Sequence, residues 1–412
     1  MGSEGNRAFV WAVAHVAAHE LPDRAAAPVL ERAAAGVDSW SVVMHLLRVH
    51  RCETLAYRIL TMPAVRAACE PAESIVGDLR NSYRRTFERV AFEPRVVAGL
   101  LSELAAAGVP ALAIKGLVVG AWLYDDPVLR EHDDIDLLVP EALAASAHSV
   151  LTNLGYEAGY RPPLFPLESP GGADYGHPGR ELHVDLSFDP WLLFWRNEAA
   201  HRDLFDTWWA RRQDLEIGGY RLPTLGPEDQ FIQLARHLQF HDYFRANMWV
   251  DLGRLLHRHG DRLDWDIVGR DARAFGIHGG LYRTLELLAR GLAVPVPDAA
   301  ADAMRPSWPV RRLHRRIWED DLAGVRERLP IAGRPIIPRF LSPGGPHPIA
   351  GVVLHALNPS RGRTLQYLVR RYVPPQDWLR SVYADTDRRS YPALLRHHWQ
   401  QLVELRRRVR NL

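Results

Sequence analysis

The chain has 412 residues, of which 47% are hydrophobic and 24% charged, and its formal net charge at pH 7 is +2. This composition is that of an ordinary globular protein with room for two or three domains. The near-neutral charge gives no general affinity for nucleic acid or for an anionic membrane. The two cysteines, Cys52 and Cys69, are too few for a metal framework and fit a reducing compartment.

The first residues show neither a signal-peptide nor a myristoylation pattern, and no uncharged apolar run approaches the length of a membrane span. We therefore expect a cytoplasmic protein with no membrane partner.

Residues 1–95 predict a helical region, because apolar residues recur at helical spacing, as at Val10, Val13 and Val16. A further helix is expected at residues 94–107, closed by Gly108 in a left-handed conformation.

After Gly108 the pattern changes to short apolar strands that alternate with helices. Strands are expected at residues 109–114, 135–139 and 182–186, and helices at residues 116–124 and 141–154. Strand–helix–strand order over so short a stretch is typical of a compact α/β unit, which we assign to residues 96–222. Within it, residues 161–180 are rich in Pro and Gly, which indicates either a disordered segment or, as we favour, an active-site flap.

Beyond Trp191 the sequence predicts helices again. They are expected to begin at Pro227 and to cover residues 249–259, 265–275 and 280–292. We assign residues 223–300 to a helical domain that completes a cleft over the α/β core. Residues 301–412 read as a mostly helical extension with a Pro/Gly-rich linker.

The chemistry centres on Asp134 and Asp136, which flank one apolar residue at the start of an expected strand. Strand side chains alternate faces, so both carboxylates point the same way, close enough to share divalent cations. Asp185, on another apolar strand, can supply a third carboxylate. Such a set suits a metal-assisted displacement at phosphorus, since buried unpaired carboxylates are costly without a metal.

Lys115 is the only lysine among the 51 Lys and Arg residues, and it precedes Gly116 where a strand gives way to a helix. A helix N-terminus offers backbone N–H groups to an anion, glycine allows close approach, and a slender ammonium fits one phosphate oxygen. Arg130 can clamp a triphosphate or can pair with Glu131 or Asp126, and the sequence leaves these alternatives open.

These motifs together resemble a known protein family. Lys115-Gly116, then Tyr124-Asp125-Asp126-Pro127, Arg130 and the strand that begins at Asp134 are similar to the bacterial "uncharacterised nucleotidyltransferase" family of the DNA polymerase β-like superfamily. The strand that carries Asp185 and the helices from Leu234 to Trp265 add to the likeness. The resemblance implies an α+β fold, in which a small mixed-sheet nucleotidyltransferase core is flanked by N- and C-terminal helical regions.

The resemblance also implies the roles of the site residues. Asp134, Asp136 and Asp185 would bind two Mg²⁺ ions, and Asp185 would help to activate the acceptor. Lys115 and Gly116 would hold the triphosphate of ATP or another NTP. Ser187 stands where the family has His, so no role of that His is carried over to this chain. Asp133 is either a solvated neighbour, which we favour, or a spare metal ligand.

Other residues carry weaker signals. His237 and His241 share a helix face but lack the glutamate of a metalloprotease. The resemblance places His237 near the cleft and so implies that it contacts nucleotide or acceptor. Asp251 would orient a histidine or pair with Arg254. The tryptophans at positions 191, 195, 208 and 209 are either core residues or an aromatic floor for a ligand.

We therefore expect an Mg²⁺-dependent nucleotidyltransferase that transfers a nucleoside monophosphate, AMP from ATP, to a small-molecule or peptide acceptor and releases pyrophosphate. The alternatives are an adenylate-forming ligase of specialised metabolism and a toxin-type nucleotidyltransferase acting on tRNA or protein.

Overall fold

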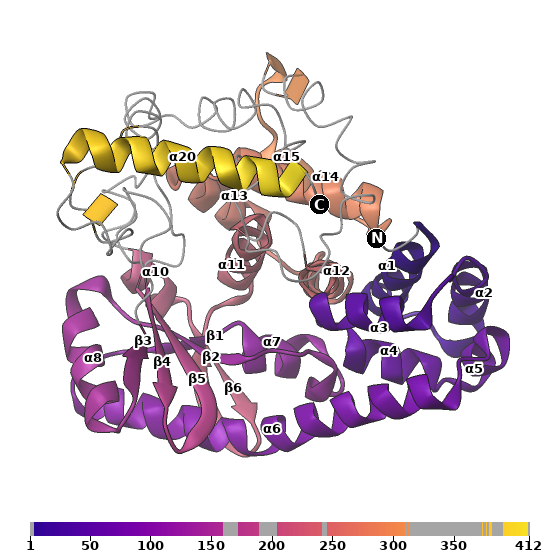
Figure 1. The fold of residues 1–412 in the computed structure, drawn as a ribbon. Coiled ribbons are helices and arrows are strands. Elements are labelled where there is room, and N and C mark those ends of the chain that lie inside the picture. The colour runs from indigo at the N-terminus through magenta and orange to yellow at the C-terminus, as the bar shows by residue number, and fades with distance from the viewer. Residues whose placement is uncertain are drawn as a thin grey trace.

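The computed structural model describes residues 4–159, 172–188, 204–240, 245–309, 311–312 and 390–410, with a few single positions between 373 and 380. A single mixed sheet of seven described strands lies beside a long helix, with further helices on both sides of it in the chain (Figure 1). The predicted α+β class is confirmed. Among the described residues, no helix combines the length and the apolar character that a membrane crossing requires.

The N-terminal region is helical, as predicted. Its helices are α1 (Glu4–Ala18), α2 (Asp23–Ala34), α3 (Trp40–Val49), α4 (Glu53–Leu60), α5 (Pro63–Cys69) and α6 (Glu73–Ala106). The predicted start of a helix near Pro94 is wrong, because these residues form the second half of the 34-residue α6. Buried apolar residues such as Leu79 and Val97 lie on both sides of Pro94, so packing holds the helix together across the proline. Gly108 has φ +72°, which confirms the left-handed cap.

The sheet has the strand order β3-β4-β5-β2-β1-β7-β6. Its strands are β1 (Leu112–Ile114), β2 (Asp134–Leu138), β3 (Glu157–Gly159), β4 (Gly172–His177), β5 (Arg180–Ser187), β6 (Gln213–Ile217) and β7 (Tyr220–Thr224). β2 runs antiparallel to β1 and parallel to β5, while β7 runs parallel to β1. The three predicted strands are therefore confirmed and form the middle of the sheet.

Two expectations about the sheet are wrong. The end of the Pro/Gly-rich segment is strand β4 rather than part of a flap, because its backbone pairs along β5; residues 160–171 lie outside the described part. The chain after Trp191 also contains the hairpin β6–β7 rather than helices alone. Its turn is Gly218-Gly219, and both glycines have positive φ, as a tight hairpin turn requires.

Helices connect and follow the strands. They are α7 (Gly116–Leu123), α8 (Ala144–Asn153), α10 (Leu204–Ala210), α11 (Pro227–Phe240), α12 (Ala246–His259), α13 (Trp265–Ala274), α14 (His278–Gly291), α15 (Asp298–Met304) and α20 (Tyr391–Arg410), with short 3₁₀ turns at Pro127–Leu129 and Glu141–Leu143. The predicted helix start at Pro227 is confirmed, and the three helices expected after it correspond to α12, α13 and α14.

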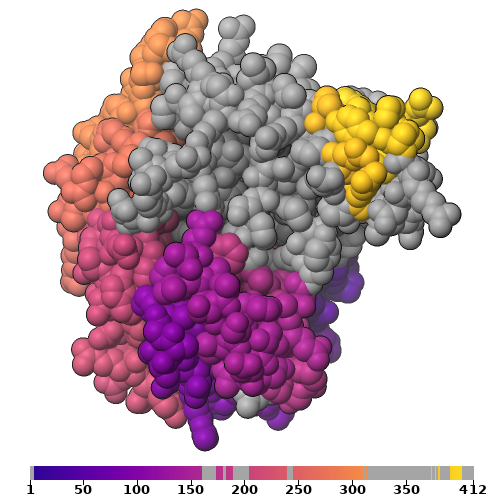
Figure 2. Space-filling model, turned by 90° about the vertical axis from the view of Figure 1, so that its left-hand side faces the viewer, coloured from indigo at the N-terminus to yellow at the C-terminus, as the bar shows by residue number. Residues whose placement is uncertain are grey.

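Two hydrophobic cores hold these elements. One joins the N-terminal helices to the helices after the sheet, with Phe9, Val13 and Trp249 fully or almost fully buried. The other lies between the sheet, α8 and the second half of α6, around Val97 and Val184. Helix α6 runs beneath both parts (Figure 1). Figure 2 shows the side of the molecule on which the residues of the sheet region, in magenta, lie below the residues of α20, in yellow.

Candidate active site

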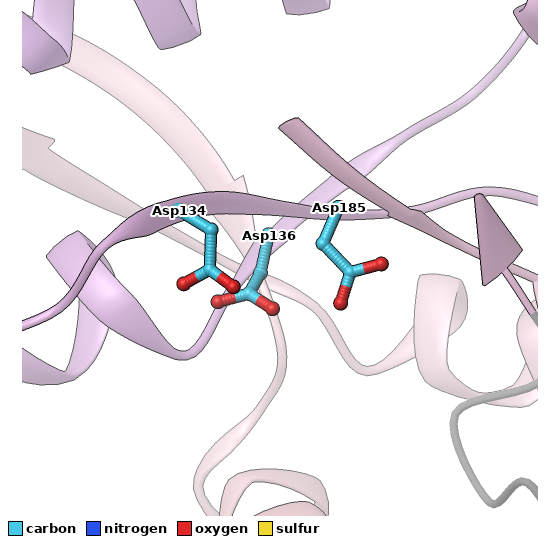
Figure 3. Close-up of side chains that lie close together, drawn as sticks. All are labelled: Asp134, Asp136 and Asp185. Atoms are coloured by element: carbon cyan, nitrogen blue, oxygen red, sulfur yellow. The ribbon is translucent and has the colours of Figure 1, made fainter. Parts of the chain in front are cut away.

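Three aspartates meet where β2 and β5 lie side by side. Asp134 and Asp136 are two residues apart on β2 and so project from the same face, and the parallel register places Asp136 opposite Asp185. Figure 3 shows the three carboxylates on one side of the strands, with Asp136 between the other two. One oxygen of each lies within 4.8 Å of the others, and Asp136 is buried. The structure thus brings together the three carboxylates that the sequence singled out.

Lys115 places its ammonium directly on this cluster. β1 sets Ile114 opposite Asp136, and Lys115 follows as the last residue before α7. Its Nζ lies 2.7 Å from Oδ1 of Asp136 and 3.9 Å from Oδ2 of Asp185. The predicted contact of Lys115 with a triphosphate stays a prediction, because the ammonium here serves as the counter-ion of the carboxylates.

The backbone of Lys115 has φ +51° and ψ −134°, a conformation that favours glycine over any residue with a side chain. A strained residue persists only where its surroundings fix it, and the side chain of Lys115 is held at Asp136 by a 2.7 Å hydrogen bond.

The charges of the site influence one another strongly. Burial raises the pKa of Asp136 to about 7, and the nearby Asp134 and Asp185 add to the rise although Lys115 opposes it. Burial would lower the pKa of Lys115, but the carboxylates outweigh it and hold the pKa above its usual value. Burial would raise the pKa of Asp134, but the cations Lys115 and Arg51 lower it below its usual value. The cluster therefore has more negative charge than one lysine can neutralise.

Gly116 is confined by packing. A methyl group built on it would lie 3.0 Å from Cδ2 of His132 and 3.3 Å from the carbonyl oxygen of Asp134. His132 is itself buried, with Nε2 2.7 Å from the carboxylate of Glu93 on α6. Close packing against His132 therefore accounts for the glycine, and its contact with phosphate stays a prediction.

Arg130 has a partner that differs from both of those weighed on the sequence. Its guanidinium donates from two nitrogens, at 3.2 and 3.1 Å, to one carboxylate oxygen of Asp251 on α12. Tyr124 donates to the other oxygen of Asp251 at 2.7 Å. The expected pairing of Asp251 with Arg254 is wrong, because Arg254 instead donates to Glu20. Tyr124, Arg130 and Asp251 are all buried. Their contacts connect the segment before β2 to α12.

Asp133 is a surface residue, as favoured on the sequence, since 70% of its side chain is exposed. It forms an ion pair with Arg51 from the turn between α3 and α4. Sequence reasoning missed Arg51, His132 and Asp174, which lies opposite Asp185 on β4. No local motif marks them, because their places follow from contacts between distant segments.

The remaining candidates are less informative. His237 lies half-buried on α11, and its contact with a nucleotide stays a prediction. His183 is exposed and sits opposite Asp134 in the sheet. Trp208 is fully buried, which confirms the core interpretation for that residue. His241, Trp191 and Trp195 lie outside the described residues.

The donor set fits a hard divalent cation. Three carboxylates from two rigid strands offer oxygen ligands within the span that one or two ions occupy, and their charge is only partly neutralised by Lys115. Among the described residues, Asp134, Asp136 and Asp185 are the one group of three or more His, Cys, Asp or Glu side chains close enough together to hold a metal ion.

Residues 37–293 match the protein family described as "Uncharacterised nucleotidyltransferase". The match covers more than half of the chain and includes the three aspartates and Lys115. The chain belongs to this family. It is a nucleotidyltransferase, and the resemblance noted from its motifs is confirmed.

Comparison with other proteins adds little to this assignment. A solved structure, that of an antigenic nucleotidyltransferase-like protein from Paracoccidioides brasiliensis, is 18% identical and covers 50% of this chain and 95% of its own, with a TM-score of 0.29. Since that score is low, the fold of the nucleotidyltransferase rests on its own strand order. No curated protein shows significant similarity to this chain.

Proposed function

We propose that this nucleotidyltransferase transfers a nucleoside monophosphate, AMP from ATP, to a small-molecule or peptide acceptor and releases pyrophosphate. The observation that carries the proposal is the set of three carboxylates whose oxygens lie within 4.8 Å of one another. The net charge of +2 favours a small acceptor over a long nucleic acid, which a broad basic surface would bind.

In this proposal, Asp134, Asp136 and Asp185 would hold two Mg²⁺ ions, and the chemistry that these ions would supply is neutralisation of the charge at the reacting phosphate. The acceptor oxygen forms a bond to the α-phosphorus, and the bond from that phosphorus to the β-bridging oxygen breaks. The electron pair leaves with pyrophosphate, and Asp185 takes the proton of the acceptor hydroxyl. The protein's contribution is to position the groups and neutralise their charge.

The proposed nucleotide site also uses Lys115, Gly116, Arg130 and His237. Lys115 contacts Asp136 at 2.7 Å, so its charge favours the ionised form of that carboxylate. With cations bound at the carboxylates, the Lys115 ammonium would be available to a triphosphate at the start of α7. Arg130 is fixed by Asp251, so it contributes its positive charge from a set position.

The test is turnover of the full chain with each of the four NTPs, labelled at the α-phosphate, against a panel of hydroxyl, phosphate and carboxylate acceptors. We expect Mg²⁺-dependent release of pyrophosphate and a stable labelled acceptor with one of them. Asp136→Asn should abolish the signal, while the matched change at an exposed aspartate, Asp261→Asn, should leave it intact. Release of free AMP with a ligated product would identify an adenylate-forming ligase instead, and labelled tRNA or protein would identify the toxin-type activity.

A further inference from the structure

Two arginines from outside the α/β core converge beside Asp134. Arg51 follows α3, and its guanidinium pairs with the carboxylate of Asp133, the residue directly before Asp134. The Arg51 side chain is 21% exposed, whereas that of Asp133 is 70% exposed, so the pair lies at the rim of the carboxylate cluster.

Arg245 is held next to Arg51 by the start of α12. The backbone N–H of Ala246 donates to Nδ1 of His50 at 3.3 Å, and that of Asn247 donates to the carbonyl oxygen of His50 at 3.3 Å. His50 immediately precedes Arg51, so these bonds hold the backbones of the two arginines close together, and the charges of their side chains act on each other. The Nε of Arg245 is buried, and no hydrogen-bond partner for it is found among the described residues.

The two guanidinium groups repel each other. Burial and the charge of Arg51 lower the pKa of Arg245 to about 10, although Asp133 and Asp134 partly compensate. The third arginine of this area, Arg130, is already held in place by Asp251. An anion placed between Arg51 and Arg245 would relieve their repulsion, and the planar fork of arginine matches phosphate oxygens two at a time.

The position of the pair decides which phosphate it would meet. Asp136 separates Asp134 from Asp185 (Figure 3). In an in-line displacement the acceptor and the leaving group lie on opposite sides of the phosphorus. With the acceptor at Asp185, the leaving pyrophosphate lies toward Asp134, which is the end where Arg51 and Arg245 converge.

We propose that Arg51 and Arg245 bind the β- and γ-phosphates of the nucleotide, so that the N-terminal helical region forms one wall of the nucleotide site. This inference rests on the proposed function for the identity of the ligand. It gives the N-terminal helices a role in the reaction. It also requires the turn after α3 and the start of α12, which are 196 residues apart in the chain, to keep their contact.

The test is equilibrium binding of the full chain to inorganic tripolyphosphate and to Mg²⁺ complexes of ATP and AMP. Arg51→Gln and Arg245→Gln should each weaken the binding of ATP and tripolyphosphate about 10- to 100-fold, the loss expected for a charge-assisted hydrogen bond, and leave AMP nearly unchanged. Arg221→Gln is the matched control, because Arg221 is 80% exposed and pairs with Asp214 on the neighbouring strand β6.

A second variant separates a binding role from a structural one. Asp133→Asn removes the partner of Arg51, so it should tighten tripolyphosphate binding if Arg51 serves the anion. Unchanged tripolyphosphate and ATP binding in Arg51→Gln and Arg245→Gln, or an equal loss of AMP binding, would overturn the inference. If the arginine variants bind normally while Asp136→Asn abolishes Mg²⁺-dependent ATP binding, only this inference fails. Wild-type protein that binds tripolyphosphate through both arginines but no nucleotide would instead refute the proposed function.

Discussion

Replacing Lys115 by methionine removes the cation that holds three carboxylates together while keeping most of the side-chain volume. The Lys115 side chain is 12% exposed and that of Asp136 is 5% exposed, so the pair at 2.7 Å is a buried one. Breaking a buried ion pair by removing one partner costs roughly 3–5 kcal/mol, because the other charge is left uncompensated. We therefore expect Lys115→Met to lower the free energy of unfolding of the metal-free protein by about that amount at pH 8.

Thermal unfolding in EDTA and in excess Mg²⁺ measures this effect. The ion can replace the ammonium as counter-charge, so Mg²⁺ should raise the melting temperature of Lys115→Met more than that of the wild type. Arg221→Met is the control, since breaking its exposed pair with Asp214 should cost at most about 1 kcal/mol. A Lys115→Met protein that unfolds in EDTA like the wild type, or one that Mg²⁺ does not rescue, would refute the counter-ion role.

Three further predictions follow from the same contacts. The pKa of Asp136 is about 7 in the folded state, above its unfolded value, so the folded state holds the proton more tightly. As pH rises from about 4 to 7, the metal-free wild type should therefore lose stability relative to Asp136→Asn by an amount on the order of a few kcal/mol. A pH-independent difference between the unfolding free energies of the two proteins would contradict this. Asp251→Asn leaves the buried Arg130 without its counter-charge and should cost roughly 3–5 kcal/mol in denaturant unfolding, so a cost below about 1 kcal/mol would show the pair to be dispensable. Gly116→Ala should destabilise by about 1–3 kcal/mol through overpacking, whereas Gly77→Ala, which meets open space in a helix, should be neutral or stabilising; equal melting temperatures for the two would exclude the close packing.

The sequence predicted the centre of the site well because the signals there are local. Asp134 and Asp136 show their shared face through strand alternation alone, and the apolar run of β5 marks Asp185 as a strand residue. Lys115 was conspicuous by composition, and its place between β1 and α7 follows from the change of hydrophobic pattern.

What the sequence did not predict depends on contacts between distant segments. Arg130 had plausible partners nearby in the chain, yet it pairs with Asp251 across 121 residues. Strand β4 is hidden in a segment rich in Pro and Gly, and only pairing with β5 makes it a strand. The continuity of α6 through Pro94 likewise comes from tertiary packing, which overrides the local preference of proline.

These contacts also suggest why the flanking helices accompany the core. The Arg130–Asp251 pair connects the approach to β2 with α12, and His50 connects α12 with the turn that carries Arg51. Both connections hold an arginine, Arg130 or Arg51, whose charge acts on Asp134. Helices that look like separate regions in the sequence would then set the distance between the carboxylates and the phosphates of a bound nucleotide.

The measurement that tests the central claim most directly is the joint binding of a divalent cation and a nucleotide at the three carboxylates. Mn²⁺ can be followed by electron paramagnetic resonance while a non-hydrolysable ATP analogue is added to the full chain. We predict that analogue and ion bind together, that EDTA abolishes binding of the analogue, and that Asp136→Asn weakens it at least about 10-fold while Asp261→Asn does not. Binding of the analogue with equal affinity in EDTA, or in Asp136→Asn, would contradict the assignment of this site.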